Sequence, residues 1–240
     1  EAARTIVRTR TTVISALMVK RGDADALICG AVGRYHRHLR DIRDVIGKRA
    51  GIHDVAALNL LLADNYSIFI ADTQVTDQPS IEQIAEITSL SAEAVQRFGI
   101  EPRVGLVSHS SFGSNESVTS KMMREALKLI QELSPDLQVE GEMRAAAALD
   151  PRIREQIFPN SNFDGGANLL IMPTKDAANI AFHLAQVMTQ GISVGPILVG
   201  TSQPAHIVSA TTTVRGLVNM TALAVVDAQG QSIGSLQAKD

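Results

Sequence analysis

The sequence is poor in cysteine and in aromatic residues, and it contains no long apolar run. Its single cysteine, Cys29, excludes an intrachain disulfide and a zinc site built on several cysteines, which predicts a cytoplasmic protein. Aromatic residues make up 3% of the chain and tryptophan is absent, so stacking surfaces for single-stranded nucleic acid are not expected. No apolar run approaches the roughly 20 residues that cross a bilayer, so no membrane partner is expected either.

Length and charge are those of an ordinary globular protein. The 240 residues can bury a core as one large domain or as two lobes, with 45% hydrophobic and 20% charged residues. A formal net charge of −3 gives no general attraction to nucleic acid. The histidines are scattered, and only His36 and His38 lie close in sequence. Because positions two apart face different sides of a helix, we predict no metal site.

Short apolar runs that alternate with amphipathic segments predict an α/β protein. Strands are expected at 26–30, 66–71, 104–107, 137–140, 167–172 and 196–199. Helices are expected at 1–21, 34–46, 81–98, from the loop after 107 to 133, at 177–188 and at 214–228, with a frayed tail from 229. Since the strands are short, apolar on both faces and separated by helices, the sheets should be mainly parallel and covered by helices.

The segment Arg103–Ser117 is the most informative part of the chain. Its apolar run, Val104–Val107, leads into a serine-rich loop with one glycine, and a helix follows. Such a loop offers backbone N–H groups, hydroxyls and the positive end of a helix dipole, which together hold anions. A well-capped turn is the alternative that the local sequence leaves open. His109 is a candidate base there, although no carboxylate lies near it in sequence.

Other polar clusters have two interpretations as well. The basic run 34–49 is either a polyphosphate site or a solvated helix face. Asp176 and Asn179 follow a strand, where they either contact a ligand at the sheet edge or cap the next helix. The cluster Ser209–Thr213 either cradles a phosphate or caps the last helix.

Taken together, these segments resemble the phosphate acetyl/butyryltransferase family. The similar blocks follow the family's order between about residues 10 and 228, at 107–114, 135–142, 167–173, 176–180, 195–200 and 204–219. Within the family, three segments look most like the C-terminal transferase-like domain of hybrid NADP-dependent malic enzymes: 158–161, 176–182 and 218–226. Because the family's domain begins with additional β/α units, the resemblance implies that this chain is truncated at its N-terminus.

The resemblance implies a two-lobed fold of the isocitrate/isopropylmalate dehydrogenase type. Residues 1–46 and 199–240 would form a partial first lobe, and 47–198 a central lobe that dimerises, so a homo-oligomer is expected. The residues expected to bind acetyl-CoA or phosphate are Arg40, Ser108, Ser110, Gly113, Ser114, Asp176, Asn179 and Ser209.

Departures from the family pattern bear on catalysis. Where active transferases carry an arginine and an Asp-Asp pair near the final helix, this chain has Ala210 and Arg215-Gly216. Phe112 replaces the usual lysine of the loop, and Ala146 replaces an aspartate. Losing the guanidinium removes a bidentate phosphate contact, and losing the carboxylate removes a candidate base for the CoA thiol. The sequence therefore predicts no catalytic residue in this chain.

The resemblance thus predicts a non-catalytic domain that senses acetyl-CoA and carries no cofactor of its own. A malic enzyme domain in the same polypeptide would decarboxylate malate oxidatively to pyruvate, using NADP and a divalent metal, Mg²⁺ or Mn²⁺. Two alternatives stay open: an active phosphate acetyltransferase, which converts acetyl-CoA and phosphate to acetyl phosphate and CoA, and a purely structural oligomerisation module.

Overall fold

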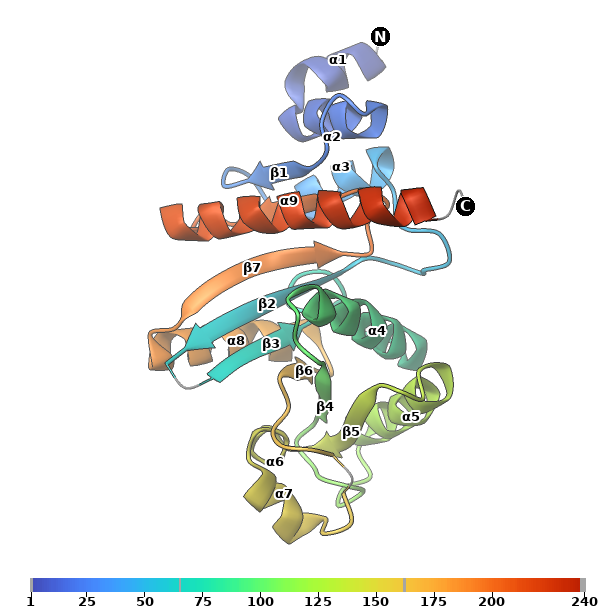
Figure 1. Cartoon of the computed structure of the whole chain (residues 1–240), viewed down its shortest axis with the longest axis vertical. Coiled ribbons are helices and arrows are strands. Elements are labelled where there is room, and N and C mark those ends of the chain that lie inside the picture. The colour runs from blue at the N-terminus through green and yellow to red at the C-terminus, as the bar shows by residue number, and fades with distance from the viewer. Residues whose placement is uncertain (1, 65, 162, 238–240) are drawn as a thin grey trace. The chain divides into compact units, whose positions relative to one another are not determined.

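The computed structural model describes residues 2–64, 66–161 and 163–237 (Figure 1). The chain divides into two compact units, one of Glu1–Val55 with Val194–Asp240 and the other of Ala56–Ser193. The two lobes predicted from the sequence have their boundaries after residues 46 and 198, whereas the two units divide after residues 55 and 193. Within the described ranges, no helix is long and apolar enough to cross a bilayer.

The first unit holds a two-stranded sheet and four helices. Its elements are α1 (Ala2–Thr9), α2 (Thr11–Arg21), β1 (Leu27–Gly30), α3 (Tyr35–Val45), β8 (Ala205–Val208) and α9 (Val214–Gln237). β1 and β8 are parallel and in register from Leu27↔Ala205 to Gly30↔Val208. The loops that follow these two strands therefore leave from the same edge of the sheet.

Two helix predictions in this unit were wrong in extent. The predicted helix 1–21 is interrupted at Arg10, whose backbone is extended with φ −113° and ψ 98°. It ends as predicted at Gly22, which has φ 77° and donates its N–H to the carbonyl of Val19. Helix α9 continues past the predicted end at 228 to Gln237, and the last residues of the predicted tail, 238–240, lie outside the described ranges.

The second unit is built on a larger sheet with the strand order β5-β4-β6-β3-β2-β7. Its strands are β2 (Ala56–Ala63), β3 (Tyr66–Ala71), β4 (Arg103–Val107), β5 (Gln138–Met143), β6 (Leu169–Ile171) and β7 (Ile192–Val199), the last of which runs into the first unit. β3, β6, β4 and β5 are mutually parallel, whereas β2 and β3 form an antiparallel pair. The predicted α/β fold with a mainly parallel sheet is confirmed.

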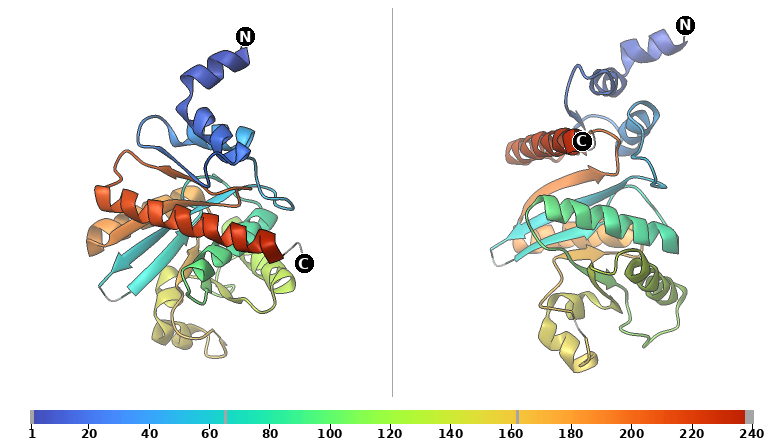
Figure 2. Two further views of the ribbon diagram at one scale, coloured as in Figure 1. Left: turned by 45° about the horizontal axis from the view of Figure 1, so that its top comes forward. Right: turned by 45° about the vertical axis from the view of Figure 1, so that its right-hand side comes forward.

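Helices cover both faces of this sheet. They are α4 (Ile81–Arg97), α5 (Val118–Leu133), α6 (Ala145–Leu149), α7 (Pro151–Ile157) and α8 (Lys175–Thr189). Alternate residues of one strand serve the two sides, since Ile70 packs with Phe182 of α8 in the core while Phe69 meets Phe98 beyond α4. Figure 1 shows α4 in front of β3 and α8 behind it. The α6–α7 segment, yellow in Figure 2, lies beside β4 and β5.

The parallel strands bring four connections to one edge of the sheet, because β3, β6, β4 and β5 all end there. After β3, the buried carboxylate of Asp72 accepts N–H bonds from Ala57, Gln74, Val75 and Thr76. Burial raises the pKa of this carboxyl. Asp72 therefore stabilises its own loop. The serine-rich loop after β4 leaves from the same edge of the sheet and is the candidate site.

Candidate functional site

The loop Ser108–Ser117 between β4 and α5 encloses a network of buried hydroxyl groups. Ser120, in the first turn of α5, is its centre and is fully buried. Its Oγ lies 2.8 Å from that of Ser110, 2.9 Å from that of Ser117 and 3.3 Å from that of Ser108. The predicted residues Ser108 and Ser110 are therefore buried, and the hydroxyls of both contact the hydroxyl of Ser120.

A carboxylate from the neighbouring strand fills the inside of this loop. Glu142, near the end of β5, is 0% exposed, and its Oε1 accepts a hydrogen bond from the Ser110 hydroxyl. The same oxygen lies 3.3 Å from the N–H of Gly113 and 3.5 Å from Nη1 of Arg124. Among the described residues its other oxygen, Oε2, is buried and has no hydrogen-bond partner. The hydroxyl and N–H donors of this loop, which the sequence suggested would bind an external anion, are therefore directed at a carboxyl group of the protein itself.

Of the two sequence interpretations of this loop, the structure shows the capped turn. Ser117 caps α5, because its hydroxyl accepts the N–H of Ser120 at 3.2 Å. Ser114 is exposed, and its Oγ accepts the N–H of Ser111 at 3.0 Å. The loop is a capped turn at its end and a carboxylate-binding cradle at its start.

An aromatic pair fixes the apex of the loop. Phe112 has a φ of 50°, which a residue with a side chain seldom adopts. Its ring stacks on that of Phe158, with centroids 4.5 Å apart and planes inclined by 18°. Position 112, where the resemblance led us to expect a lysine, thus presents an uncharged ring held against the end of α7.

Two exposed side chains lie on the rim of the loop. His109 is exposed, with Nδ1 3.5 Å from the Ser108 hydroxyl. Arg144 follows β5 directly, and its Nε donates to the carbonyl of His109 at 3.0 Å. The backbone N–H of Arg144 donates to Ser111 Oγ at 3.1 Å. Sequence reasoning missed Arg144, although its position at the end of a parallel strand was the available signal.

The other two predicted residues of this unit lie on α8. Thr174 is the N-cap of that helix, since its hydroxyl accepts the N–H of Ala177 at 3.2 Å. The expectation that Asp176 or Asn179 supplies the cap was therefore wrong. Asp176 is exposed in the first turn, and Asn179 donates from Nδ2 to the carbonyl of Thr73 at 3.3 Å.

Ser209 and Arg40 belong to the first unit. Ser209 follows β8, and its exposed hydroxyl lies 2.9 Å from that of Thr211 and 3.3 Å from that of Thr212. Thr213 caps α9 by accepting the N–H of Gly216 at 3.0 Å. Position 210 contributes only a methyl group to this loop. Arg40 is exposed on α3.

The basic run has the contacts of a helix face with local partners. Arg43 pairs with Asp54 at 2.6 Å, and the ammonium of Lys48 donates to the carbonyl of His53. His38 bridges Thr12, at 2.7 Å from Nδ1, and the carbonyl of Val32, at 2.9 Å from Nε2. These contacts favour the structural interpretation of the run over a polyphosphate site.

Cys29 in β1 is not an activated thiol. Burial raises its pKa to about 11, so little thiolate forms near neutral pH. In the described part of the chain, no group of three or more histidine, cysteine, aspartate or glutamate side chains is placed to hold a metal ion.

Comparison with known proteins identifies the class. The phosphate acetyl/butaryl transferase family matches residues 1–225, and the chain belongs to it. It is similar in structure to a phosphotransacetylase from Streptococcus pyogenes, with a TM-score of 0.84 and 27% identity, over 93% of this chain and 67% of that one. A phosphate acetyltransferase from Synechocystis sp. (strain ATCC 27184 / PCC 6803 / Kazusa) is 32% identical over 89% of this chain and 31% of its own length.

Within this class, similarity is higher to malic enzymes. An NAD-dependent malic enzyme from Rhizobium meliloti (strain 1021) is 54% identical over 95% of this chain. An NADP-dependent malic enzyme from Escherichia coli (strain K12) is 48% identical over 97% of it. The chain spans only 30% and 31% of the lengths of these two relatives, so it corresponds to a transferase-like part of much larger proteins.

Proposed function

We propose that this chain is the regulatory, transferase-like domain of a cytoplasmic malic enzyme, that it binds acetyl-CoA as an allosteric effector, and that it does not transfer acetyl groups. The parent polypeptide would decarboxylate malate to pyruvate and CO₂ with a nicotinamide cofactor and a divalent metal. The malic enzyme names of the relatives at 54% and 48% identity support this assignment. The same proposal takes the two units as lobes of the isocitrate/isopropylmalate dehydrogenase type.

The nicotinamide cofactor and the metal are assigned to the rest of the parent protein. No described cluster of this chain fits a divalent metal, so no step of malate chemistry is placed on its residues. The two relatives are named for different nucleotides, NAD and NADP.

The proposal that this chain does not transfer acetyl groups rests on one observation: Glu142 occupies the hydrogen-bond donors of the loop Ser108–Ser117. The hydroxyl of Ser110 and the N–H of Gly113 both point at its buried carboxylate. A phosphoryl group placed at the same donors would have to displace this carboxyl group from them. In the first unit, the side chain of Ala210 offers no donor for phosphate, and the hydroxyl of Ser209 lies within hydrogen-bond distance of those of Thr211 and Thr212.

Allosteric control requires that acetyl-CoA bind two states of the parent enzyme with different affinity. Two measurements therefore test the proposal. Calorimetric titration of the chain with acetyl-CoA should show saturable binding, and acetyl-CoA should lower malate oxidation by the full-length parent enzyme. A flat titration, or an unchanged malic activity at saturating acetyl-CoA, contradicts the regulatory role.

The alternative of an active transferase has its own support, because a phosphate acetyltransferase is 32% identical to this chain. A colorimetric assay of free thiol, with acetyl-CoA and phosphate as substrates, separates the two functions. We expect no release of CoA above the uncatalysed rate. Sustained turnover by the purified chain would replace the regulatory proposal with the catalytic one.

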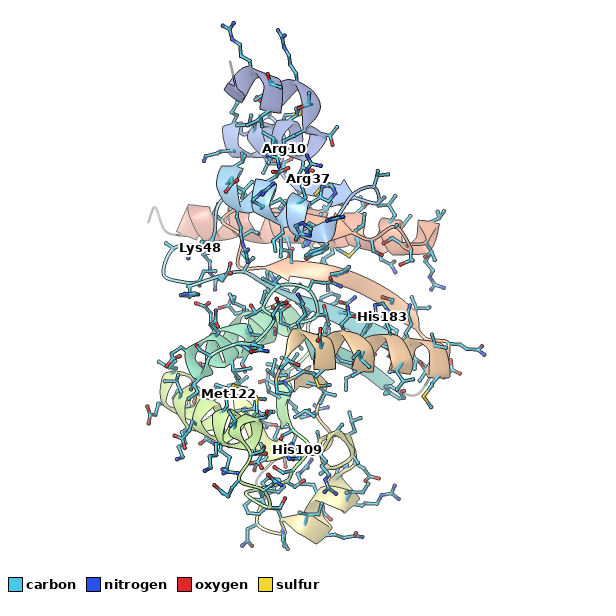
Figure 3. All side chains as sticks on the ribbon, turned by 180° about the vertical axis from the view of Figure 1, so that it is seen from behind. Arg10, Arg37, Lys48, His109, Met122 and His183 are labelled. Atoms are coloured by element: carbon cyan, nitrogen blue, oxygen red, sulfur yellow. The ribbon has the colours of Figure 1, made fainter. Side chains whose placement is uncertain are left out.

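We further propose that the second unit forms a homodimer through α8. This helix exposes an apolar stripe with i, i+4, i+7 and i+8 spacing: Ile180 (66% exposed), Leu184 (60%), Val187 (77%) and Met188 (75%). The only titratable side chain between them is His183, which Figure 3 labels on this helix. An apolar stripe on a surface helix suits packing against its own copy, because a two-fold interface pairs the same patch of both subunits.

Sedimentation equilibrium tests this interface. Leu184→Asp should convert the dimer to monomer, because a charge would be buried in the contact. Val218→Asp on α9 is the matched control, since Val218 is 62% exposed and lies in the other unit. An unchanged mass for Leu184→Asp rejects α8 as the interface.

A further inference from the structure

We propose that Arg144, together with His109, forms an anion-binding site on the rim of the loop Ser108–Ser117, and that this site holds a phosphate group of the ligand. The inference rests on the proposed function, in which acetyl-CoA supplies the phosphate. Acetyl-CoA carries a 3′-phosphate on its ribose and a pyrophosphate bridge, and either one presents the oxygen atoms that a guanidinium recognises.

The interior of the loop is closed to such a group. Glu142 is fully buried there and already receives the donors of Ser110 and Gly113. Arg124, the cation nearest to it, divides its guanidinium between Glu142 at 3.5 Å and Glu116 at 3.0 Å. An anion that approaches this loop therefore finds its available donors on the outside.

Arg144 is held in place without being neutralised. Its Nε donates to the carbonyl of His109, and its own N–H donates to Ser111. Within the described residues, neither Nη atom of Arg144 has a hydrogen-bond or ion-pair partner. The first bond fixes the guanidinium through its Nε, and the second fixes the backbone from which the side chain leaves. Less side-chain entropy is therefore lost when the two Nη atoms bind a phosphate.

The exposed Arg152 of this unit is in a different state. Arg152 follows in the next helix, and its guanidinium makes two bonds to the carboxylate of Asp150, at 3.1 Å and 2.9 Å. A ligand phosphate would have to displace that carboxylate. Among the residues that the structure describes, no carboxylate pairs with Arg144, which is why the structure assigns the anion to it.

His109 supplies a second donor on the same rim. Its carbonyl is the acceptor for Arg144, so the two residues are adjacent by direct contact. The imidazole is exposed, and Nε2 has no partner among the described residues. Figure 3 labels His109 on the loop, in the lower part of that view.

Calorimetric titration with acetyl-CoA tests the site on three variants of the chain. Arg144→Met should bind about 10-fold more weakly, since a charge-assisted bidentate contact is lost. Arg144→Lys should lose about 3-fold, because it keeps the charge but not the fork of donors. Arg152→Met is the control and should bind like the unaltered chain. All three changes are at exposed positions, so the melting temperature should stay the same.

One further probe, 3′-dephospho-acetyl-CoA, identifies the phosphate. If 3′-dephospho-acetyl-CoA binds the unaltered chain and Arg144→Met equally, the site holds the 3′-phosphate. If the difference persists with this probe, the site holds the pyrophosphate. Either result, together with the loss for acetyl-CoA, supports the site.

The failure of this inference can be distinguished from that of the proposed function. Equal affinity of the unaltered chain and Arg144→Met for acetyl-CoA overturns the rim site and leaves the effector role intact. If the unaltered chain does not bind acetyl-CoA, the effector role fails, and titration with inorganic pyrophosphate then decides the rim site alone. Weaker pyrophosphate binding by Arg144→Met supports the site, and equal or absent binding rejects it.

Discussion

Two hydroxyl-rich loops, one in each unit, differ in the groups that their hydroxyls contact. The loop after β4 and the loop after β8 both follow a buried strand and both begin a helix with a hydroxyl cap, Ser117 or Thr213. In the first, Ser110 is 1% exposed and bonds to a buried carboxylate. In the second, Ser209 is exposed and bonds to neighbouring threonines. The difference comes from the adjacent strand, because β5 delivers Glu142 to the first loop.

The largest expected effect comes from removing that carboxylate. Glu142→Ala leaves the donors of Ser110 and Gly113 without their acceptor and Arg124 without its buried partner, so we expect a loss of about 3–5 kcal/mol. Hydrogen exchange should show the loss in the amides of the second unit. Glu116→Gln, which removes the exposed partner of Arg124, should change stability far less, because solvent screens this pair. If the two variants lose similar stability, Glu142 does not organise the loop.

The same substitution in both loops should have unequal effects. Ser110→Ala removes a buried hydrogen bond to a charged group and should cost about 1.5–3 kcal/mol. Ser209→Ala removes exposed contacts between hydroxyls and should cost less than about 0.5 kcal/mol. Urea denaturation followed by circular dichroism compares them. Equal losses would mean that the two loops are stabilised in the same way.

The helix caps should, by contrast, behave alike. Ser117→Ala and Thr213→Ala each remove an acceptor for an N–H in the first turn of a helix. We expect each to cost about 1 kcal/mol, measured by the same denaturation experiment. The loss at Ser117 could also exceed the loss at Thr213 by more than about 1 kcal/mol. That result would show that the contact between the hydroxyls of Ser117 and Ser120 contributes more than the cap, in which Ser117 accepts the N–H of Ser120.

The smallest effect on stability is expected from adding a cation to the second loop. Ala210→Arg places a guanidinium in an exposed loop whose hydroxyls need no rearrangement, so the melting temperature without ligand should not change. Phosphate at millimolar concentration should raise the melting temperature of this variant above that of the unaltered chain, by mass action. Acetyl transfer should still be absent. Turnover by this single variant would show that the missing arginine was the only obstacle to catalysis.

Sequence reasoning succeeded where local chemistry decides the structure. The sequence Ser80-Ile-Glu-Gln83 has the pattern of a capping box, and both reciprocal bonds are present. Asp150 caps α7 ahead of Pro151, a pattern that the sequence also contains. Sequence reasoning failed at β2. The sequence of this strand, AALNLLLA, is rich in alanine and leucine and has no β-branched residue, so propensity argues for a helix. This segment is a strand because it pairs with β3 from Leu58↔Ala71 to Ala63↔Tyr66.

The same limit applies to the site. The serine-rich loop was found from its own residues, because an apolar run that ends in hydroxyls is a local pattern. The partner that fills it was not predicted, since Glu142 lies 32 residues from Ser110 and reaches it only across the β4–β5 pair. Arg144 was missed for the same reason, because its contact with His109 spans 35 residues.

By itself, the sequence determined the α/β class, most helix starts and the position of the hydroxyl loops, because periodicity and capping act within a few residues. The tertiary structure decided which charges enter those loops. Parallel pairing in register, with Leu106 opposite Gly141, brings the end of β5 beside the loop after β4. There the strand buries a carboxylate inside the loop and leaves a guanidinium on its rim.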